Sequence, residues 1–129
     1  MLEYHTIAED GVISGKHRFF AGQILYSKIR PNLSKVIIVD FDGLCSADMY
    51  PIEAKGNTKF LWYQMLSDRF VDYASNSGSR TVLPKINQKG LSIIPMKICS
   101  IEEQNEVVIQ IESRLSQATA SETYIENAL

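Results

Sequence analysis

The chain has 129 residues, of which 45% are hydrophobic and 22% charged, and its formal net charge is −2 at pH 7. This length and composition predict a single globular domain with enough chain to bury a core. No apolar run approaches the roughly 20 residues of a membrane span, and the N-terminal segment lacks a signal-peptide pattern. We therefore expect a cytoplasmic protein without a membrane partner.

The charge is unevenly distributed along the chain. Residues 100–129 carry six acidic residues and one basic residue, whereas residues 1–99 carry 12 basic and 9 acidic residues. Two stretches, 16–35 and 73–101, contain basic residues and no acidic ones. Such asymmetry indicates either a polyanionic partner for the first part of the chain or an ordinarily solvated surface.

The patterns up to residue 99 predict an α+β fold with a twisted, mostly antiparallel sheet and a packed helix. "GQILYSKI" and "SKVIIVDFD" are typical of two strands joined by a turn at Arg30-Pro31-Asn32. "GLCSADMYPIE" predicts a third strand, with Pro51 at a sheet edge. A helix is expected from Asn57 or Thr58 to about Ala74, followed by a loop and a short strand from Ser92 to Lys97.

A long helix is predicted from residue 100 to near the C-terminus. Ser100 and Glu103 have the spacing of a capping box, which satisfies free amides at a helix start. Apolar residues then recur at spacings of three and four, a narrow stripe that favours pairing with another helix. The alternative, a helix packed back on its own domain, stays open. The stripe consists of Val108, Ile111, Leu115, Ala118, Ile125 and Leu129.

The sequence offers no constellation for catalysis. It contains no Gly-x-Ser-x-Gly elbow, phosphate-binding loop, dinucleotide fingerprint or His-Glu-x-x-His motif. His5 and His17 are the only histidines, so zinc-ligand spacing is absent, and Asp40, Asp42 and Asp48 lack the pattern of a calcium loop. We expect a non-enzymatic protein without a cofactor or metal, and a small hydrolase or nuclease is the disfavoured alternative.

The basic, acid-free stretches suit nucleic acid instead. Lys and Arg bind phosphates, while Asn, Ser, Gln and Arg can hydrogen-bond base edges. We expect the hairpin around Arg30 to contact phosphates and the segment 76–88, with Arg80, to read bases. The candidate DNA-binding residues are Lys16, Arg18, Lys28, Arg30, Asn32, Lys35, Asn76, Ser79, Arg80, Lys85, Asn87 and Lys89.

Three segments, in order, resemble the specificity subunit of type I restriction–modification systems. They are "GQILYSKIRPNLSKVIIVDFDGLCSADMYPI", "NTKFLWYQMLSDRFVDYA" and "LSIIPMKICSIEEQNEVVIQIESRL", which together cover about residues 20–117. The resemblance implies a target-recognition domain over 1–99 that reads half of a bipartite DNA site, and a spacer helix beginning in 100–129. It also implies double-stranded DNA and the modification (methyltransferase) and restriction subunits as partners, with catalysis in those subunits.

The sequence departs from that family in three respects. It has one recognition domain and one spacer helix where the family has two, it enters the domain late, and it lacks a second proline before Glu103-Gln104. These departures leave open a half-subunit that pairs with a second half or with its own copy, a gene remnant, or an expressed fragment. The competing hypothesis is a protein-interaction fragment that pairs through its C-terminal helix and does not bind DNA alone.

Overall fold

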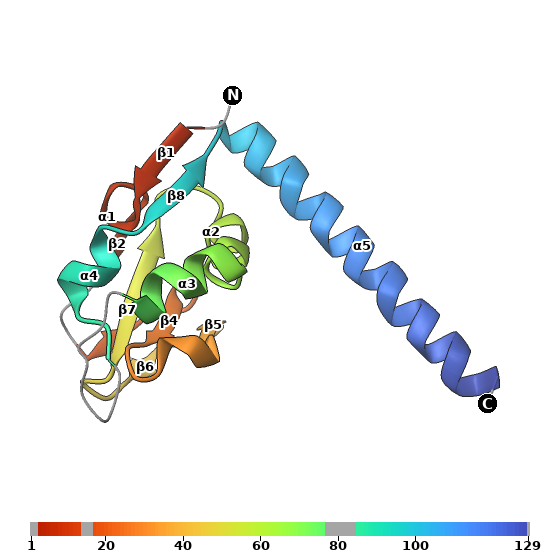
Figure 1. Ribbon diagram of the computed structural model, residues 1–129, viewed down its shortest axis with the longest axis horizontal. Helices are drawn as coiled ribbons and strands as arrows, with labels where there is room; N and C mark the ends of the chain where they lie inside the picture. The colour runs from red at the N-terminus through yellow and green to blue at the C-terminus, as the bar shows by residue number, and fades with distance from the viewer. Residues whose placement is uncertain (1–2, 14–16, 77–84, 129) are drawn as a thin grey trace.

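The computed structural model describes residues 3–13, 17–76 and 85–128 (Figure 1). Its elements are β1 (Glu3–Thr6), α1 (Ile7–Asp10), β2 (Gly11–Ile13), β3 (Arg18–Phe19), β4 (Ile24–Ser27), the 3-10 helix η1 (Pro31–Leu33), β5 (Val36–Ile38), β6 (Gly43–Leu44), β7 (Met49–Ala54), α2 (Thr58–Met65), α3 (Asp68–Asn76), α4 (Gln88–Ser92), β8 (Pro95–Ile98) and α5 (Ile101–Ala128). The strands and short helices form one body, from which α5 projects (Figure 1). The predicted α+β class with a long terminal helix is thus confirmed. None of the described helices is both long and apolar enough to cross a bilayer.

The central sheet has four strands in the order β2-β7-β4-β5. Ile24 of β4 lies opposite Ile38 of β5 on one side and Ile52 of β7 on the other. Two smaller sheets pair β1 with β8 and β3 with β6. All these pairs are antiparallel, as predicted.

Strand β4 is buried along its whole length because it has a strand on each side and packed side chains on both faces. Ile24 and Tyr26 belong to the main core, where the Tyr26 and Phe70 rings meet edge to face with centroids 5.9 Å apart. Leu25 instead packs with Phe19 and Val39 in a second cluster. Since successive strand residues point to opposite faces, one strand supports both clusters.

The prediction of one helix from Asn57 or Thr58 to Ala74 is wrong, because α2 and α3 are separate helices. The Ser67 hydroxyl donates to the Gln64 carbonyl (2.6 Å) and accepts from the Phe70 amide (3.3 Å). One side chain therefore caps the end of α2 and the start of α3. The predicted cap at Asn57 is confirmed, since its side-chain oxygen accepts from the Phe60 amide at 3.0 Å.

The third predicted strand is also divided, into β6 and β7, by a turn in which the Met49 amide donates to the Ser46 carbonyl. Pro51 was expected at an edge, but β7 lies between β2 and β4 and Pro51 is buried. The described pairing with β2 ends at Ile52, so the missing proline amide breaks no described bond there. The last predicted strand begins later than expected, at Pro95, because Ser92 ends α4.

Candidate nucleic-acid interface

The turn between β4 and β5 is a packed 3-10 turn rather than a loose loop. The Leu33 amide donates to the Arg30 carbonyl at 2.9 Å, and Pro31 is buried, with α3 packed against η1. Arg30 and Ser34 flank the turn with φ of 51° each, in the left-handed region that non-glycine residues rarely adopt. A turn held in this geometry fixes its exposed side chains in space, and these include those of Arg30 and Asn32.

This turn lies beside Lys85 and Ile86. Ile29 and Lys85 form an antiparallel bridge, and the Ile86 amide donates to the Lys28 carbonyl at 2.9 Å. The fully buried Ile86 side chain anchors this segment in the core. The fold thus brings together the two acid-free stretches that the sequence analysis identified separately. We call the resulting surface, made of Lys28, Arg30, Asn32, Lys35 and Lys85, the cationic edge.

The members of the cationic edge differ in their exposure and in whether they form ion pairs. Arg30, Lys35 and Lys85 are exposed, and none makes an ion pair within the described ranges. Lys28 is half-buried, with its ammonium nitrogen 3.8 Å from Asp48 and 5.8 Å from the centre of the Tyr50 ring. The stretch 16–35 contains no carboxylate of its own, but the turn before β7 brings Asp48 beside Lys28.

Asp48 and Tyr50 are the neighbours that the sequence analysis missed. Their position follows from the register of β7 on β4, in which Ser27 lies opposite Met49. Burial raises the pKa of the Tyr50 hydroxyl, and a main-chain hydrogen bond with Gln88 lowers it by less. The Tyr50 side chain thus lies close to Lys28 and to the start of α4.

The remaining candidate DNA-binding residues are not all equally available. Asn87 is exposed, but its side-chain oxygen accepts from the Gly90 amide at 2.7 Å and so serves as the N-cap of α4. Lys89 and Asn76 are exposed. Arg18 lies on β3, stacked 4.9 Å over the Phe20 ring, and no described contact joins it to the cationic edge. Lys16, Ser79 and Arg80 fall outside the described residues.

Two of the aspartates considered in the sequence analysis, Asp42 and Asp48, have separate partners at opposite ends of β4. Asp42 accepts a 2.8 Å hydrogen bond from the Ala21 amide, and Asp48 pairs with Lys28. In the described part of the chain, no group of three or more His, Cys, Asp or Glu side chains could hold a metal ion.

A second candidate surface follows α5, whose first turns pack against α2. Val108 is buried there and Ile111 is half-buried, so these residues of the predicted stripe face their own domain, as the open alternative held. Val108 is therefore not available to a partner helix. Farther along, Leu115 is 53% exposed and Ala118 is exposed. The side chains of Ile125 and Leu129 fall outside the described part.

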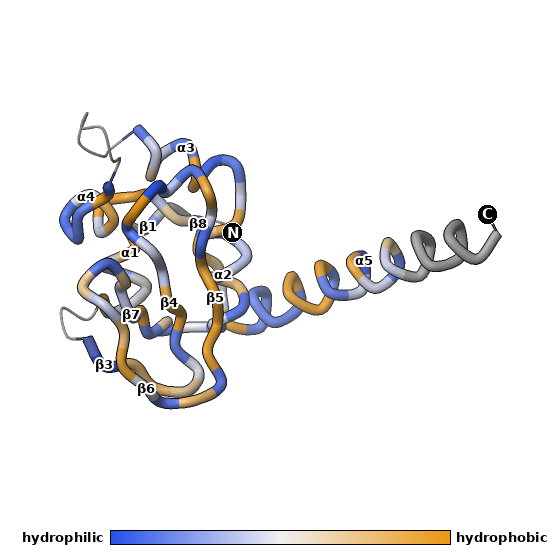
Figure 2. Tube along the Cα trace, turned by 90° about the horizontal axis from the view of Figure 1, so that it is seen from below, coloured by the Kyte–Doolittle hydropathy of each residue, from blue (hydrophilic) through white to orange (hydrophobic). Residues whose placement is uncertain are grey.

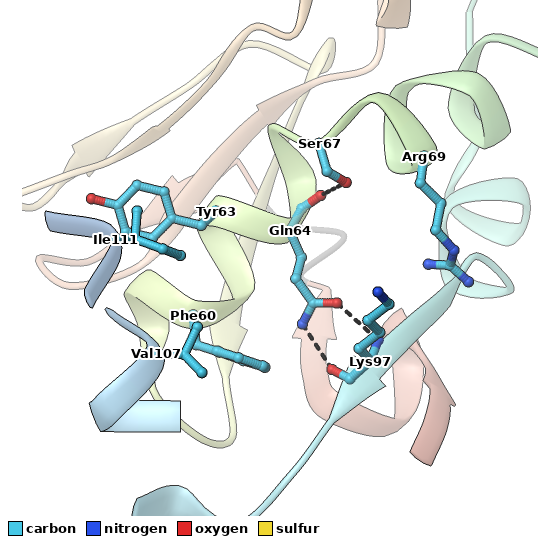
Figure 3. A pocket seen from close by; sticks show the side chains of 8 residues that line it. All are labelled: Phe60, Tyr63, Gln64, Ser67, Arg69, Lys97, Val107 and Ile111. Carbon is cyan, nitrogen blue, oxygen red and sulfur yellow. Dashed lines mark hydrogen bonds between the residues drawn. The ribbon is translucent and has the colours of Figure 1, made fainter. Parts of the chain in front are cut away.

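The junction of α5 with α2 contains a half-open cavity of about 230 Å³ (Figure 3). Phe60, Tyr63, Val107 and Ile111 supply its apolar wall. Across from them, Gln64 donates to and accepts from the Lys97 main chain, at 2.8 Å each. Hydrophobic residues also recur along the projecting part of α5 (Figure 2). Leu115 of α5 and Tyr63 of α2 line a second hollow, so apolar side chains of the domain and of the helix adjoin there.

The sequence is similar to that of a known protein over nearly its whole length. No protein-family model matches the sequence. The chain is 56% identical over 126 residues to the specificity subunit of the type I restriction enzyme EcoDI from Escherichia coli, a match that covers 98% of this chain and 28% of that subunit. The chain thus spans little more than a quarter of the relative's length.

Solved structures show the same fold. The HsdS subunit from Thermoanaerobacter tengcongensis superposes with a TM-score of 0.72 at 13% identity, over 92% of this chain and 38% of that one. The S subunit of the type I restriction-modification system from M. genitalium gives 0.69 at 12% identity, over 93% and 41%. The resemblance found in the sequence is therefore confirmed: the chain is similar, over nearly its whole length, to one part of a type I restriction enzyme specificity subunit.

Proposed function

We propose that this chain is a non-catalytic DNA-recognition module of a type I specificity subunit that reads one half of a bipartite site. Residues 1–99 act as the recognition domain, and residues 100–129 begin the spacer helix. The observation that carries the proposal is the cationic edge, where the bridge between Ile29 and Lys85 joins two acid-free stretches. Phosphate contacts from such a surface orient a domain on DNA before any base is read.

Within this proposal the candidate DNA-binding residues have different roles. Arg30, Lys35 and Lys85 contact phosphates, because they are exposed cations without an ion pair among the described residues. Asn32, Asn76 and Lys89 lie at exposed positions from which hydrogen bonds to DNA are feasible. Arg80 reads a guanine, a role that rests on the sequence alone.

The apolar surface at α5 supports a role in assembly. Leu115 and Tyr63 help to line a shallow hollow beside the cavity at the helix base, and Leu115 is 53% exposed. A second helix would cover this surface, supplied by another half-subunit or by a second copy of this chain. The modification and restriction subunits are the further partners of the assembled protein.

The decisive experiment is DNA binding as a function of salt. The 129-residue chain is titrated into random-sequence duplex DNA at several salt concentrations, with and without a modification subunit. We expect affinity that falls steeply with salt, because phosphate contacts release condensed counterions. Binding that is absent in both conditions defeats the proposal. It would leave the competing hypothesis of an interaction fragment that pairs through α5.

A further inference from the structure

Gln104 is a buried polar residue that joins two separate segments at the base of α5. Its side chain is 4% exposed. The side-chain nitrogen donates to the Cys99 carbonyl at 2.9 Å, and the side-chain oxygen accepts from the Asn57 amide, also at 2.9 Å. One side chain therefore ties the entry of α5 to the start of α2, with both ends of its amide satisfied.

Gly56 is the residue that makes room for this contact. A Cβ atom at position 56 would lie 2.5 Å from the side-chain oxygen of Gln104 and 3.2 Å from its amide carbon. A terminal amide on a flexible side chain could ordinarily move aside, but this one is held by two hydrogen bonds. No left-handed φ is involved at this glycine, so the requirement comes from space alone.

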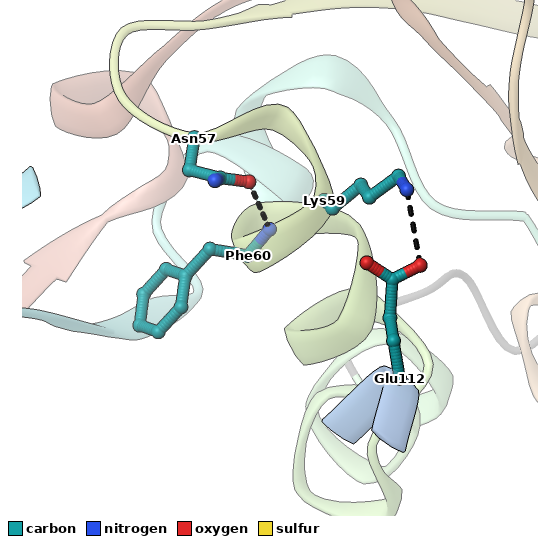
Figure 4. Close-up of polar contacts among 4 residues, drawn as sticks. All are labelled: Asn57, Lys59, Phe60 and Glu112. Atoms are coloured by element: carbon teal, nitrogen blue, oxygen red, sulfur yellow. Dashed lines mark hydrogen bonds and ion pairs between the residues drawn. The ribbon is translucent and has the colours of Figure 1, made fainter. Parts of the chain in front are cut away.

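Further contacts on the same side of α5 hold the helix against α2. The side chains of Asn57 and Asn105 share a 2.7 Å hydrogen bond, and Lys59 forms a 3.0 Å ion pair with Glu112 (Figure 4). Val108, which lies between Asn105 and Glu112 in the sequence, is buried. The Lys59–Glu112 pair is exposed and so contributes little by itself. Residues 113–119 are all exposed, which limits the docking of the described helix to its first three turns.

We propose that Gln104 is the positioning residue that sets the direction in which α5 leaves the recognition domain. The buried amide is the only one of these contacts that fixes main chain on both sides of the junction in the described structure. The direction of α5 matters because a recognition domain and a spacer helix must engage DNA and a partner at the same time. That consequence rests on the proposed function, whereas the direction itself does not.

Residual dipolar couplings of the 129-residue chain test the proposal, because they report the orientation of α5 relative to the sheet. In the parent, one alignment should fit the couplings of the sheet and of residues 101–118. In Gln104→Ala the sheet couplings should still agree with one another, while those of α5 should shrink and no longer fit the same alignment. Gln110→Ala is the matched control, since that side chain is exposed and, among the described residues, hydrogen-bonds only Glu106 on the same helix.

Gly56→Ala tests the same contact by placing a methyl group against the Gln104 amide. It should loosen α5 in the parent and have no added effect in Gln104→Ala, where the obstructing amide is gone. A common alignment in Gln104→Ala, or equal loosening by Gly56→Ala in both backgrounds, would overturn the proposal. The couplings are measured without DNA, so they do not depend on the proposed function. Absence of salt-dependent DNA binding, with and without a modification subunit, would defeat the proposed function and leave the role of Gln104 standing.

Discussion

The main-chain amide of Ile86 donates a 2.9 Å hydrogen bond to the carbonyl oxygen of Lys28, and the neighbouring residues Ile29 and Lys85 form a bridge. Neither contact involves a charged group, yet together they place cations from distant parts of the chain on one surface. Because Ile86 is fully buried, the position of Lys85 is fixed by the core rather than by its own charge. The cationic edge is therefore a property of the fold.

We expect the combined change Arg30→Ala, Lys35→Ala and Lys85→Ala to weaken binding to every DNA sequence. Removing one phosphate interaction should reduce the slope of log affinity against log salt by up to about 0.9. Fluorescence anisotropy with random duplexes at several salt concentrations measures both effects. The control is Lys55→Ala with Lys97→Ala and Arg114→Ala, which removes the same number of exposed cations outside the cationic edge. Equal weakening in the two variants would mean that only net charge matters.

Asp48→Asn should strengthen DNA binding, because it removes the carboxylate that lies 3.8 Å from Lys28. Exposed ion pairs contribute about 0.2–1 kcal/mol, so we expect a gain of at most about fivefold in affinity. Asp40→Asn removes the same charge from an exposed position after β5 and serves as the control. The same binding assay decides: a comparable gain in Asp40→Asn contradicts a specific restraint on Lys28.

Arg80→Ala should relax the preference for one base pair, because a bidentate contact with guanine discriminates by about 1–3 kcal/mol. Selection from a random duplex library, with parent and variant in parallel, measures the change in the preferred motif. Identical motifs from the two proteins would restrict Arg80 to a phosphate contact or a structural role. Lys89→Ala is the control, since the loss of an exposed cation that contacts phosphate should lower affinity without changing the motif.

Tyr26→Phe should raise the free energy of unfolding by about 1 kcal/mol, because the buried hydroxyl has no hydrogen-bond partner in the described structure. Burial also raises the pKa of Tyr26 from 10.0 to about 12. Because the pKa is higher in the folded than in the unfolded state, the ionisation of Tyr26 does not affect the free energy of unfolding below pH 10. It lowers that free energy as the pH rises from 10 toward 12.

Urea unfolding of parent and variant at pH 7 and pH 11 measures both effects. The advantage of Tyr26→Phe should grow at the higher pH. Tyr50→Phe provides the comparison, since Tyr50 is only half-buried and its hydroxyl is not a buried group without a partner, so its removal should not stabilise the protein. A destabilised Tyr26→Phe would show that the hydroxyl has a partner in solution.

Local chemistry in the sequence predicted the starts of α2 and α5, whereas contacts between distant segments could not be predicted from it. The Asn57 cap depends on the residues just after it, and so does the Ser100 hydroxyl, which accepts from the Glu103 amide at 3.2 Å. Ser67-Asp68 carried a similar signal for the start of α3, but the continuous apolar stripe on either side concealed it. The meeting of Lys28 with Asp48 depends on strand register, which local patterns do not determine.

The apolar stripe on α5 also could not be assigned from the sequence, because residue spacing does not determine whether a helix face packs against its own domain or against a partner. Val108 and Leu115 have the same predicted role, yet one is buried in the domain and the other is 53% exposed. The burial of Val108 depends on how the start of α5 is directed onto α2. The structure therefore divides one sequence pattern into a part for folding and a part for assembly.

That division leads to opposite expectations for two substitutions. Leu115→Lys should abolish pairing of α5 with another helix and change the unfolding free energy of the domain little, because this side chain is about half exposed and lies outside the buried core. Val108→Ala should lower the unfolding free energy by about 0.5–3 kcal/mol through poorer packing, with pairing retained wherever the chain is folded. Sedimentation velocity over a range of concentrations reports pairing, and urea unfolding of the same samples reports stability. A parent chain that stays monomeric throughout, alone and with a second half-subunit, together with a Leu115→Lys variant that loses stability, would assign the whole stripe to the fold and end the case for assembly through α5.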